Sequence, residues 1–192
     1  MPRDMEGVTG LRSLRERPFE LLRELDRRAR AAAQGQPEAV ATGAEWVGVA
    51  FRLGGEAFLL AREETREVLA FPGAVTRVPG ARAWVRGLSN VRGQLLPIVD
   101  LRAFLGSGLT TVTRSTRVLI ANHREIPAGL VVDEVMGFRR FYESEFSSDL
   151  PPTLLRCERY LAGAFKRGAE VWPVFSVKTL LESQQFLQAA AS

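Results

Sequence analysis

Few residues of this 192-residue chain could do covalent chemistry, and they lie far apart. The single histidine, His123, sits in the turn-like stretch Ala-Asn-His-Arg-Glu-Ile-Pro, and the single cysteine, Cys157, sits in Leu-Leu-Arg-Cys-Glu-Arg-Tyr. Metal sites and acid–base pairs usually need a second ligand or partner, and no local motif marks Cys157 as a nucleophile. A hydrolase that pairs Cys157 with His123 through the fold remains an alternative.

Adjacent carboxylates occur at Glu63-Glu64 and at Asp133-Glu134. Neighbouring side chains on a strand point to opposite faces, so neither pair can face one substrate within one element. The sequence also lacks the Gly-x-x-x-x-Gly-Lys-Ser/Thr and Gly-x-Gly-x-x-Gly patterns of phosphate-binding loops. We therefore predict that the protein is not an enzyme and uses no cofactor and no metal.

Recognition by a charged side chain is indicated by residues 90–102, Asn-Val-Arg-Gly-Gln-Leu-Leu-Pro-Ile-Val-Asp-Leu-Arg. Gly93 permits a backbone conformation that a side chain would block. Arg92 is then held at the edge of a buried block, with its guanidinium reaching outward from a rigid support. A plain surface arginine at a strand end is the simpler alternative.

The apolar run 95–99 within this stretch predicts a strand buried along its whole length. Pro97 lacks an N–H group, so we expect an edge or a bulge at that point of the strand. Asp100 suits the N-cap of a short helix, which Gly106 would end.

Positive charge is concentrated in the middle of the chain. The net charge is +4, and residues 62–124 hold ten arginines against four acidic residues. A small β-barrel that binds nucleic acid through this segment is therefore an alternative function, and Trp84 is its one plausible base-stacking residue. Phe71 and Phe104 lie in apolar surroundings that favour the core.

The elements that must position these residues are mostly short strands. Gly54-Gly55 separates two apolar stretches and predicts a hairpin over 46–61. Further strand-like runs predict a barrel or sandwich, and they lie on both sides of about residue 108, which indicates two lobes. These runs are residues 63–71, 73–88, 117–122, 128–138 and 171–177.

Helical patterns flank the strands. Residues 18–34 begin with a proline, end before Gly35 and predict a helix, followed by a Gly/Pro/Ala/Thr linker over 35–44. Residues 177–191 carry a helical stripe of Val177, Leu180, Leu181 and Leu187. We expect an N-terminal helical extension and linker over 1–44, which docks either on its own domain or on a partner, and a β domain over 45–192.

The stretch 75–102 resembles the CheW-like domain, which is found in the coupling proteins of bacterial chemosensory arrays. The resemblance rests on Val-Thr-Arg-Val-Pro, on the Asn-hydrophobic-Arg-Gly of 90–93 and on the Pro-Ile-Val-Asp-Leu-Arg that follows. Residues 128–135, 161–163 and 171–181 agree with the later part of the family in order, so about 45–185 is covered.

This resemblance implies two intertwined five-stranded SH3-like β-barrels without an active site. It also implies an adaptor that joins a methyl-accepting chemoreceptor to a CheA-type histidine kinase, with no nucleic acid as partner. The partner-binding residues that it implies are Glu67, Val68, Asn90, Val91, Arg92, Gly93, Val132, Asp133 and Val135.

The N-terminal extension and the divergent strand after Gly55 resemble the subtype that serves the type IV pilus, or twitching, chemosensory system. The N-terminus has no apolar signal region, and no apolar run approaches the ~18 residues that a membrane-spanning helix needs. We therefore expect a cytoplasmic protein without direct membrane insertion, held near the membrane through receptor arrays.

Overall fold

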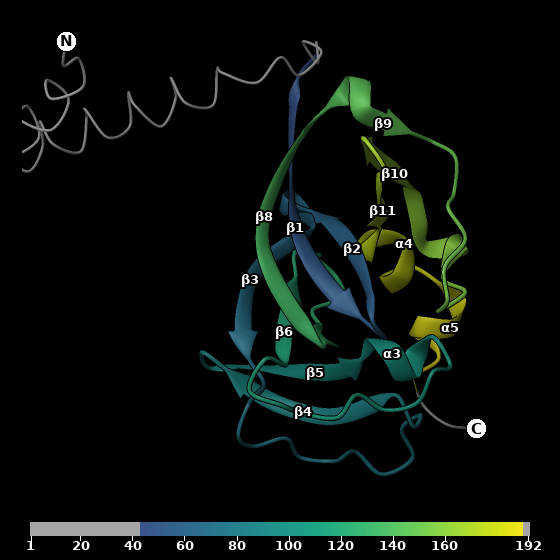
Figure 1. Cartoon of the computed structure of the whole chain (residues 1–192). Helices are drawn as coiled ribbons and strands as arrows, with labels where there is room; N and C mark the ends of the chain where they lie inside the picture. Colours follow the sequence, from purple (N-terminus) through teal and green to yellow (C-terminus); the bar gives the residue numbers. More distant parts are fainter. Residues whose placement is uncertain (1–42, 190–192) are drawn as a thin grey trace, which may run out of the picture. The chain divides into compact units, whose positions relative to one another are not determined.

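The computed structural model describes residues 43–189, and it is built mainly from β-strands (Figure 1). The predicted helix 18–34 and nearly all of the linker 35–44 lie outside the described residues. Within them, the strands form one six-stranded and one five-stranded sheet.

The six-stranded sheet has the order β8-β1-β2-β11-β10-β9. Strands β1 and β2 form the predicted hairpin, in which Gly54 and Gly55 both have positive φ. The strands are β1 (Glu45–Leu53), β2 (Glu56–Ala61), β8 (Glu134–Tyr142), β9 (Phe146–Ser147), β10 (Leu161–Arg167) and β11 (Glu170–Phe175).

The five-stranded sheet has the order β3-β6-β7-β5-β4. In Figure 1, β4 and β5 run across the lower part of the molecule, while β1 and β8 stand upright above them. The strands are β3 (Thr65–Ala70), β4 (Val85–Val91), β5 (Gln94–Asp100), β6 (Arg117–Ala121) and β7 (Gly129–Val132).

The chain enters each sheet in turn and then comes back. It makes β1 and β2 in the first sheet, β3 to β7 in the second, and β8 to β11 in the first again. The predicted pair of intertwined five-stranded units is therefore correct for one sheet and one strand short for the other. The additional strand is β9, which adds only two residues to the edge of β10.

An arginine–glutamate pair joins β10 to the segment that follows β8, the edge strand on the other side of the six-stranded sheet. Arg167 on β10 donates to Glu145 through Nε (2.6 Å) and Nη2 (2.8 Å), and Nη2 also donates to the carbonyl of Arg140 on β8. The hydrogen bonds from Arg167 to its carboxylate lower the pKa of Glu145, which follows β8 in the 3-10 turn η2 (Glu143–Glu145). The sheet curls around its own apolar cluster, which comprises Ala50, Leu59, Phe141, Phe165 and Val174.

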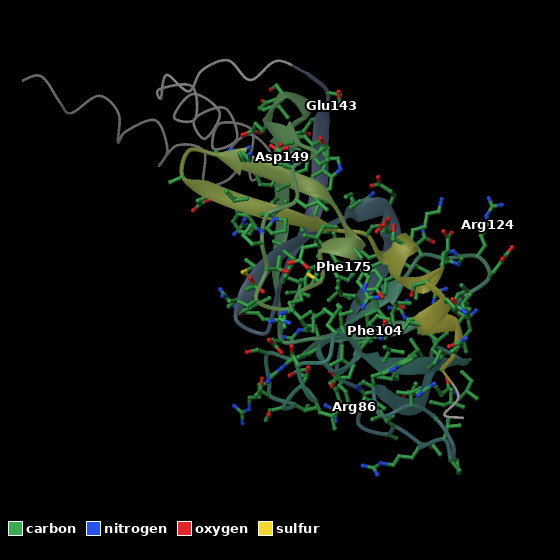
Figure 2. The ribbon with its side chains drawn as sticks, turned by 90° about the vertical axis from the view of Figure 1, so that its right-hand side faces the viewer. Arg86, Phe104, Arg124, Glu143, Asp149 and Phe175 are labelled. Carbon is green, nitrogen blue, oxygen red and sulfur yellow. The ribbon has the colours of Figure 1, made fainter. Side chains whose placement is uncertain are left out.

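A larger apolar core lies between the two sheets and takes residues from both of them. Leu60 and Phe175 come from the six-stranded sheet, while Val99 and Leu130 come from the five-stranded sheet. Phe104 joins them from α3 (Leu101–Phe104), and Figure 2 shows Phe104 and Phe175 deep inside the molecule. Burying such apolar side chains contributes roughly 1.5–3 kcal/mol each, so this core holds the two sheets together.

A buried carboxylate fixes the start of α3. Asp100 has no exposed surface, and its side chain accepts bonds from the backbone N–H of Ala103 at 3.1 Å, as the predicted N-cap requires. Thr110 donates its N–H (2.9 Å) and its hydroxyl (3.0 Å), and Arg86 forms an ion pair at 2.7 Å. Gly106 has positive φ just beyond the helix, as predicted.

The closing segment differs from the single predicted helix. It forms two short helices, α4 (Val177–Leu181) and α5 (Gln184–Leu187). The side chain of Ser183 donates to the carbonyl of Leu180 and accepts from the N–H of Phe186, so it ends one helix and caps the next. Among residues 43–189, no helix is long and apolar enough to cross a membrane.

Candidate functional site

Arg92 and Gly93 form the two-residue turn between β4 and β5. Their φ angles are 51° and 84°, and positive φ at both positions is the mark of a type I′ turn. The side chain of Asn90 accepts a hydrogen bond from the N–H of Gly93 at 2.8 Å and so fixes the turn. Positive φ is unfavourable for arginine by about 1–2 kcal/mol, so the local backbone energy alone does not favour arginine here.

The guanidinium of Arg92 reaches across to β3. Its Nη2 lies 2.9 Å from the Glu67 carboxylate, and Nη2 of Arg66 donates to the Gln94 side chain at 3.3 Å. Because β3 and β4 are the two edges of this sheet, these contacts require the sheet to curl until β3 meets the β4–β5 turn. An apolar cluster that includes Val91, Leu96, Ile98 and Val131 fills the inside of the curl.

The surface at this meeting point is partly charged and partly apolar. The Arg92 side chain is 77% exposed, and Val68 and Leu95 are 36% and 64% exposed. Four of its residues, Arg66, Glu67, Arg92 and Gln94, line one shallow depression. We call this surface the Arg92 corner, and it consists of Arg66, Glu67, Val68, Asn90, Arg92, Gly93, Gln94 and Leu95.

Leu95 corrects the prediction that the whole of 95–99 is buried. In β5 the side chains of Leu96 and Ile98 enter the core of the curled sheet, and Val99 enters the core between the sheets. Leu95 points to the other face at the end of the strand where no second sheet covers it, and it is therefore exposed.

Pro97 lies where β5 has one neighbouring strand, in agreement with the predicted edge. The parallel pairing with β7 begins only at Ile98. On the other side Pro97 faces Leu88, whose N–H and carbonyl both bond to Thr76. The missing N–H of Pro97 therefore leaves no strand partner unsatisfied.

The structure brings together only part of the predicted site. Val91 is 8% exposed and Val132 is fully buried, so both are core positions and have little or no surface to offer a partner. Asp133 accepts a hydrogen bond from the N–H of Gly54 at 2.7 Å, which pins the β1–β2 turn. Val135 is half-buried and packs against the core between the sheets.

Three further candidate residues lie in the core or stabilise a turn. Trp84, the predicted base-stacking residue, is 9% exposed and packs on Phe104 and Phe186. Cys157 is buried, and burial raises the pKa of its thiol, the opposite of what a thiolate nucleophile needs. The Nδ1 atom of His123 accepts the N–H of Ile126 at 3.1 Å and so stabilises its own turn.

The sequence interpretation missed three residues of the Arg92 corner, namely Arg66, Gln94 and Leu95. Arg66 and Val68 alternate with Glu67 on a half-buried strand, which is a period-two signal that could have located them. Gln94 and Leu95 directly follow the turn, and their exposure depends on how far the second sheet extends over β5. A single sequence does not carry that information.

Comparisons with known proteins agree with this architecture. Residues 47–185 match the family described as CheW-like domain. Protein PilI of Pseudomonas aeruginosa is 42% identical over 173 residues, which make up 90% of this chain and 96% of PilI. Protein FrzA of Myxococcus xanthus is 33% identical over 104 residues, which make up 54% of this chain and 62% of FrzA.

A solved structure resembles the fold. The crystal structure of the scaffolding protein TtCheW from Thermoanaerobacter tengcongensis superposes with a TM-score of 0.64, covering 78% of this chain and 96% of that one. The sequences are 22% identical, so this likeness concerns the fold.

Proposed function

The chain belongs to the CheW-like domain family, and on this premise we propose that it is a non-enzymatic adaptor that couples a methyl-accepting chemoreceptor to a CheA-type histidine kinase. The single observation that carries the proposal is the Arg92 corner. There a charged side chain is held, in a backbone conformation that arginine disfavours, at the point where both edges of a curled sheet meet.

The geometry of the corner suits protein recognition. Glu67 engages Nη2 of Arg92 and orients the guanidinium, while the 77% exposure of the side chain leaves other N–H donors open to solvent. Val68 and Leu95 add apolar surface beside the charge. Arginine is enriched among the residues that dominate protein–protein binding energies, and a side chain that is already oriented loses less conformational entropy on binding.

The mechanism that we propose is positional. The adaptor binds receptor and kinase through different surfaces, so their relative placement depends on the adaptor and the receptor state biases kinase activity. Each contact is expected to be of about micromolar affinity, and repetition in an array supplies the remaining avidity.

We further propose that the pathway is the chemosensory system of the type IV pilus. The match to PilI supports this, because at 90% coverage it extends into the residues before 43, beyond the family segment 47–185. The protein would then act at the cytoplasmic side of the membrane, bound to receptor arrays.

Binding of purified partners tests the proposal. The affinities of the full chain for the kinase and for the cytoplasmic part of a receptor from the same bacterium are measured by calorimetry. We expect Arg92→Glu to weaken binding of at least one partner tenfold or more, about 1.4 kcal/mol, while its circular dichroism stays unchanged.

Arg140→Glu is the matched control for this experiment. Arg140 is 73% exposed and pairs with Glu45 at 3.3 Å, so the variant makes the same charge change in a similar ion pair on the six-stranded sheet. It should bind both partners as the unmodified chain does. Failure of the unmodified chain to bind either partner, or equal loss in the two variants, would overturn the proposal.

A further inference from the structure

A cavity of about 430 Å³ lies at the end of the six-stranded sheet, and its walls carry aromatic rings and carboxylates. It takes residues from β1, β2, β9, β10 and β11 and from the 3-10 turns that follow β2 and β8. The full lining is Trp46, Ala61, Glu64, Glu143, Phe146, Ala162, Phe165, Val174, Phe175 and Ser176. A cavity of this size can bury a small ligand.

The cavity has an open mouth and a closed floor. Glu143, Phe146 and Ala162 are exposed and form the mouth, whereas Phe165 and Phe175 are buried and form the floor. Figure 2 shows this depth difference, with Glu143 at the upper end of the described chain and Phe175 in the interior.

Two of the aromatic rings occupy space that only a glycine at the neighbouring position leaves free. A Cβ atom at Gly48 would lie 2.3 Å from the Trp46 ring, and one at Gly163 would lie 2.5 Å from the Phe146 ring. Both rings also stand against Phe165, with centroid distances of 4.6 Å for Trp46 and 5.2 Å for Phe146. The aromatic wall is therefore formed by the fold before any ligand enters.

The polar groups of the wall have one sign. Every lining residue contributed by the described chain is apolar, hydroxyl-bearing or acidic. Glu64 accepts the N–H of Val177 at 2.7 Å and the hydroxyl of Ser176 at 3.2 Å, so its carboxylate is fixed at the cavity wall. Burial raises the pKa of Glu64, because desolvation disfavours the charged carboxylate. A bound positive charge would offset this desolvation cost.

Aromatic faces together with carboxylates form a favourable environment for one class of ligand. Ring faces carry negative potential and attract ammonium groups, most strongly at tryptophan, and nearby carboxylates add direct charge attraction. From the Trp46–Phe146–Phe165 wall and the Glu64 and Glu143 carboxylates, we infer that this cavity binds a small organic cation of the alkylammonium class. The site is independent of the Arg92 corner.

Choline and its neutral isostere 3,3-dimethylbutan-1-ol separate charge recognition from plain apolar binding. Each is titrated into the full-length protein at constant ionic strength, and the indole N–H signals of the three tryptophans are followed by NMR. We expect choline to shift the Trp46 signal with a Kd of about 1 mM or lower, and at least about tenfold more tightly than the isostere. The signal of Trp84, which is buried between the sheets, should stay in place.

Substitution of the carboxylates completes the test. We expect Glu64→Gln to weaken choline binding by about tenfold and Glu143→Gln, at the exposed mouth, by a smaller factor. Glu134→Gln removes a carboxylate from β8 outside the cavity and should change nothing. Equal affinity for choline and its isostere, no saturable shift of Trp46, or unchanged choline affinity in both cavity variants would each overturn the inference.

Discussion

Nη2 of Arg92 lies 2.9 Å from Oε2 of Glu67, although 24 residues separate the two positions along the chain and they belong to opposite edges of one sheet. The contact exists because the five-stranded sheet curls around its own apolar cluster. It places a turn arginine and a strand glutamate on one surface, which we propose as the recognition surface of an adaptor.

Arg92→Asn separates recognition from folding. Asparagine tolerates positive φ better than arginine, and Asn-Gly is the preferred pair for a type I′ turn. Relief of the backbone cost should balance the loss of an exposed ion pair, so the free energy of unfolding in urea should stay equal or rise by up to about 1 kcal/mol. A decrease of more than about 1 kcal/mol in the free energy of unfolding would show that the Arg92 side chain is needed for the fold.

Reversal of the Arg92–Glu67 pair tests whether the pair itself is recognised. In the double variant Arg92→Glu with Glu67→Arg an ion pair can form again, and because the pair is exposed its coupling energy should be below about 1 kcal/mol. The free energy of unfolding of the double variant should therefore equal that of the unmodified protein, whereas its affinity for the partner should stay as low as that of Arg92→Glu alone. Restored binding would mean that the pair acts only by holding the corner together.

Asp100 is expected to matter for stability alone. It is fully buried and accepts bonds from Arg86, Ala103 and Thr110, so Asp100→Asn leaves a partly buried guanidinium and the N–H groups without their carboxylate. We expect a loss of about 3–5 kcal/mol in the free energy of unfolding. Asp149→Asn, a substitution at an exposed carboxylate, should change it by less than about 0.5 kcal/mol. A loss of similar size in both variants would contradict this role.

Glu145 should make the six-stranded sheet sensitive to acid. Its hydrogen bonds from Arg167 hold its pKa in the folded protein below the ordinary value of 4.5, so the unfolded chain takes up the proton first as the pH falls. The stabilisation is complete above that value and is lost as the pH falls through the lower folded-state pKa. The stability difference between the unmodified protein and Glu145→Gln should therefore shrink between pH 6 and pH 3, measured by urea titration. A difference that stays constant over this range would contradict the assignment.

Local features of this fold were predictable from the sequence because each depends on a few neighbouring residues. The Gly54-Gly55 turn, the Asp100 N-cap and the edge at Pro97 follow from φ preference, side-chain acceptor chemistry and the missing N–H of proline. The family resemblance located Glu67 and Arg92 in two separate segments.

Features that depend on tertiary layering were not predictable in this way. Leu95 and Val99 look alike in the sequence, but only Val99 is covered by the second sheet. The apolar stripe after Val177 favoured one helix, and the hydrogen bonds of Ser183 divide it into two. The contact of Arg92 with Glu67 depends on the curl of the whole sheet, which no local pattern describes.

We propose that the chain transmits receptor state to a kinase through the Arg92 corner. This proposal is tested most directly by reconstituting a receptor of the same bacterium in vesicles with its histidine kinase and measuring kinase autophosphorylation with and without this protein. We predict that the unmodified chain makes the rate depend on the receptor, that Arg140→Glu does the same, and that the folded Arg92→Asn variant loses most of this dependence. A kinase rate that is the same with and without the chain, or full coupling by Arg92→Asn, would contradict the account.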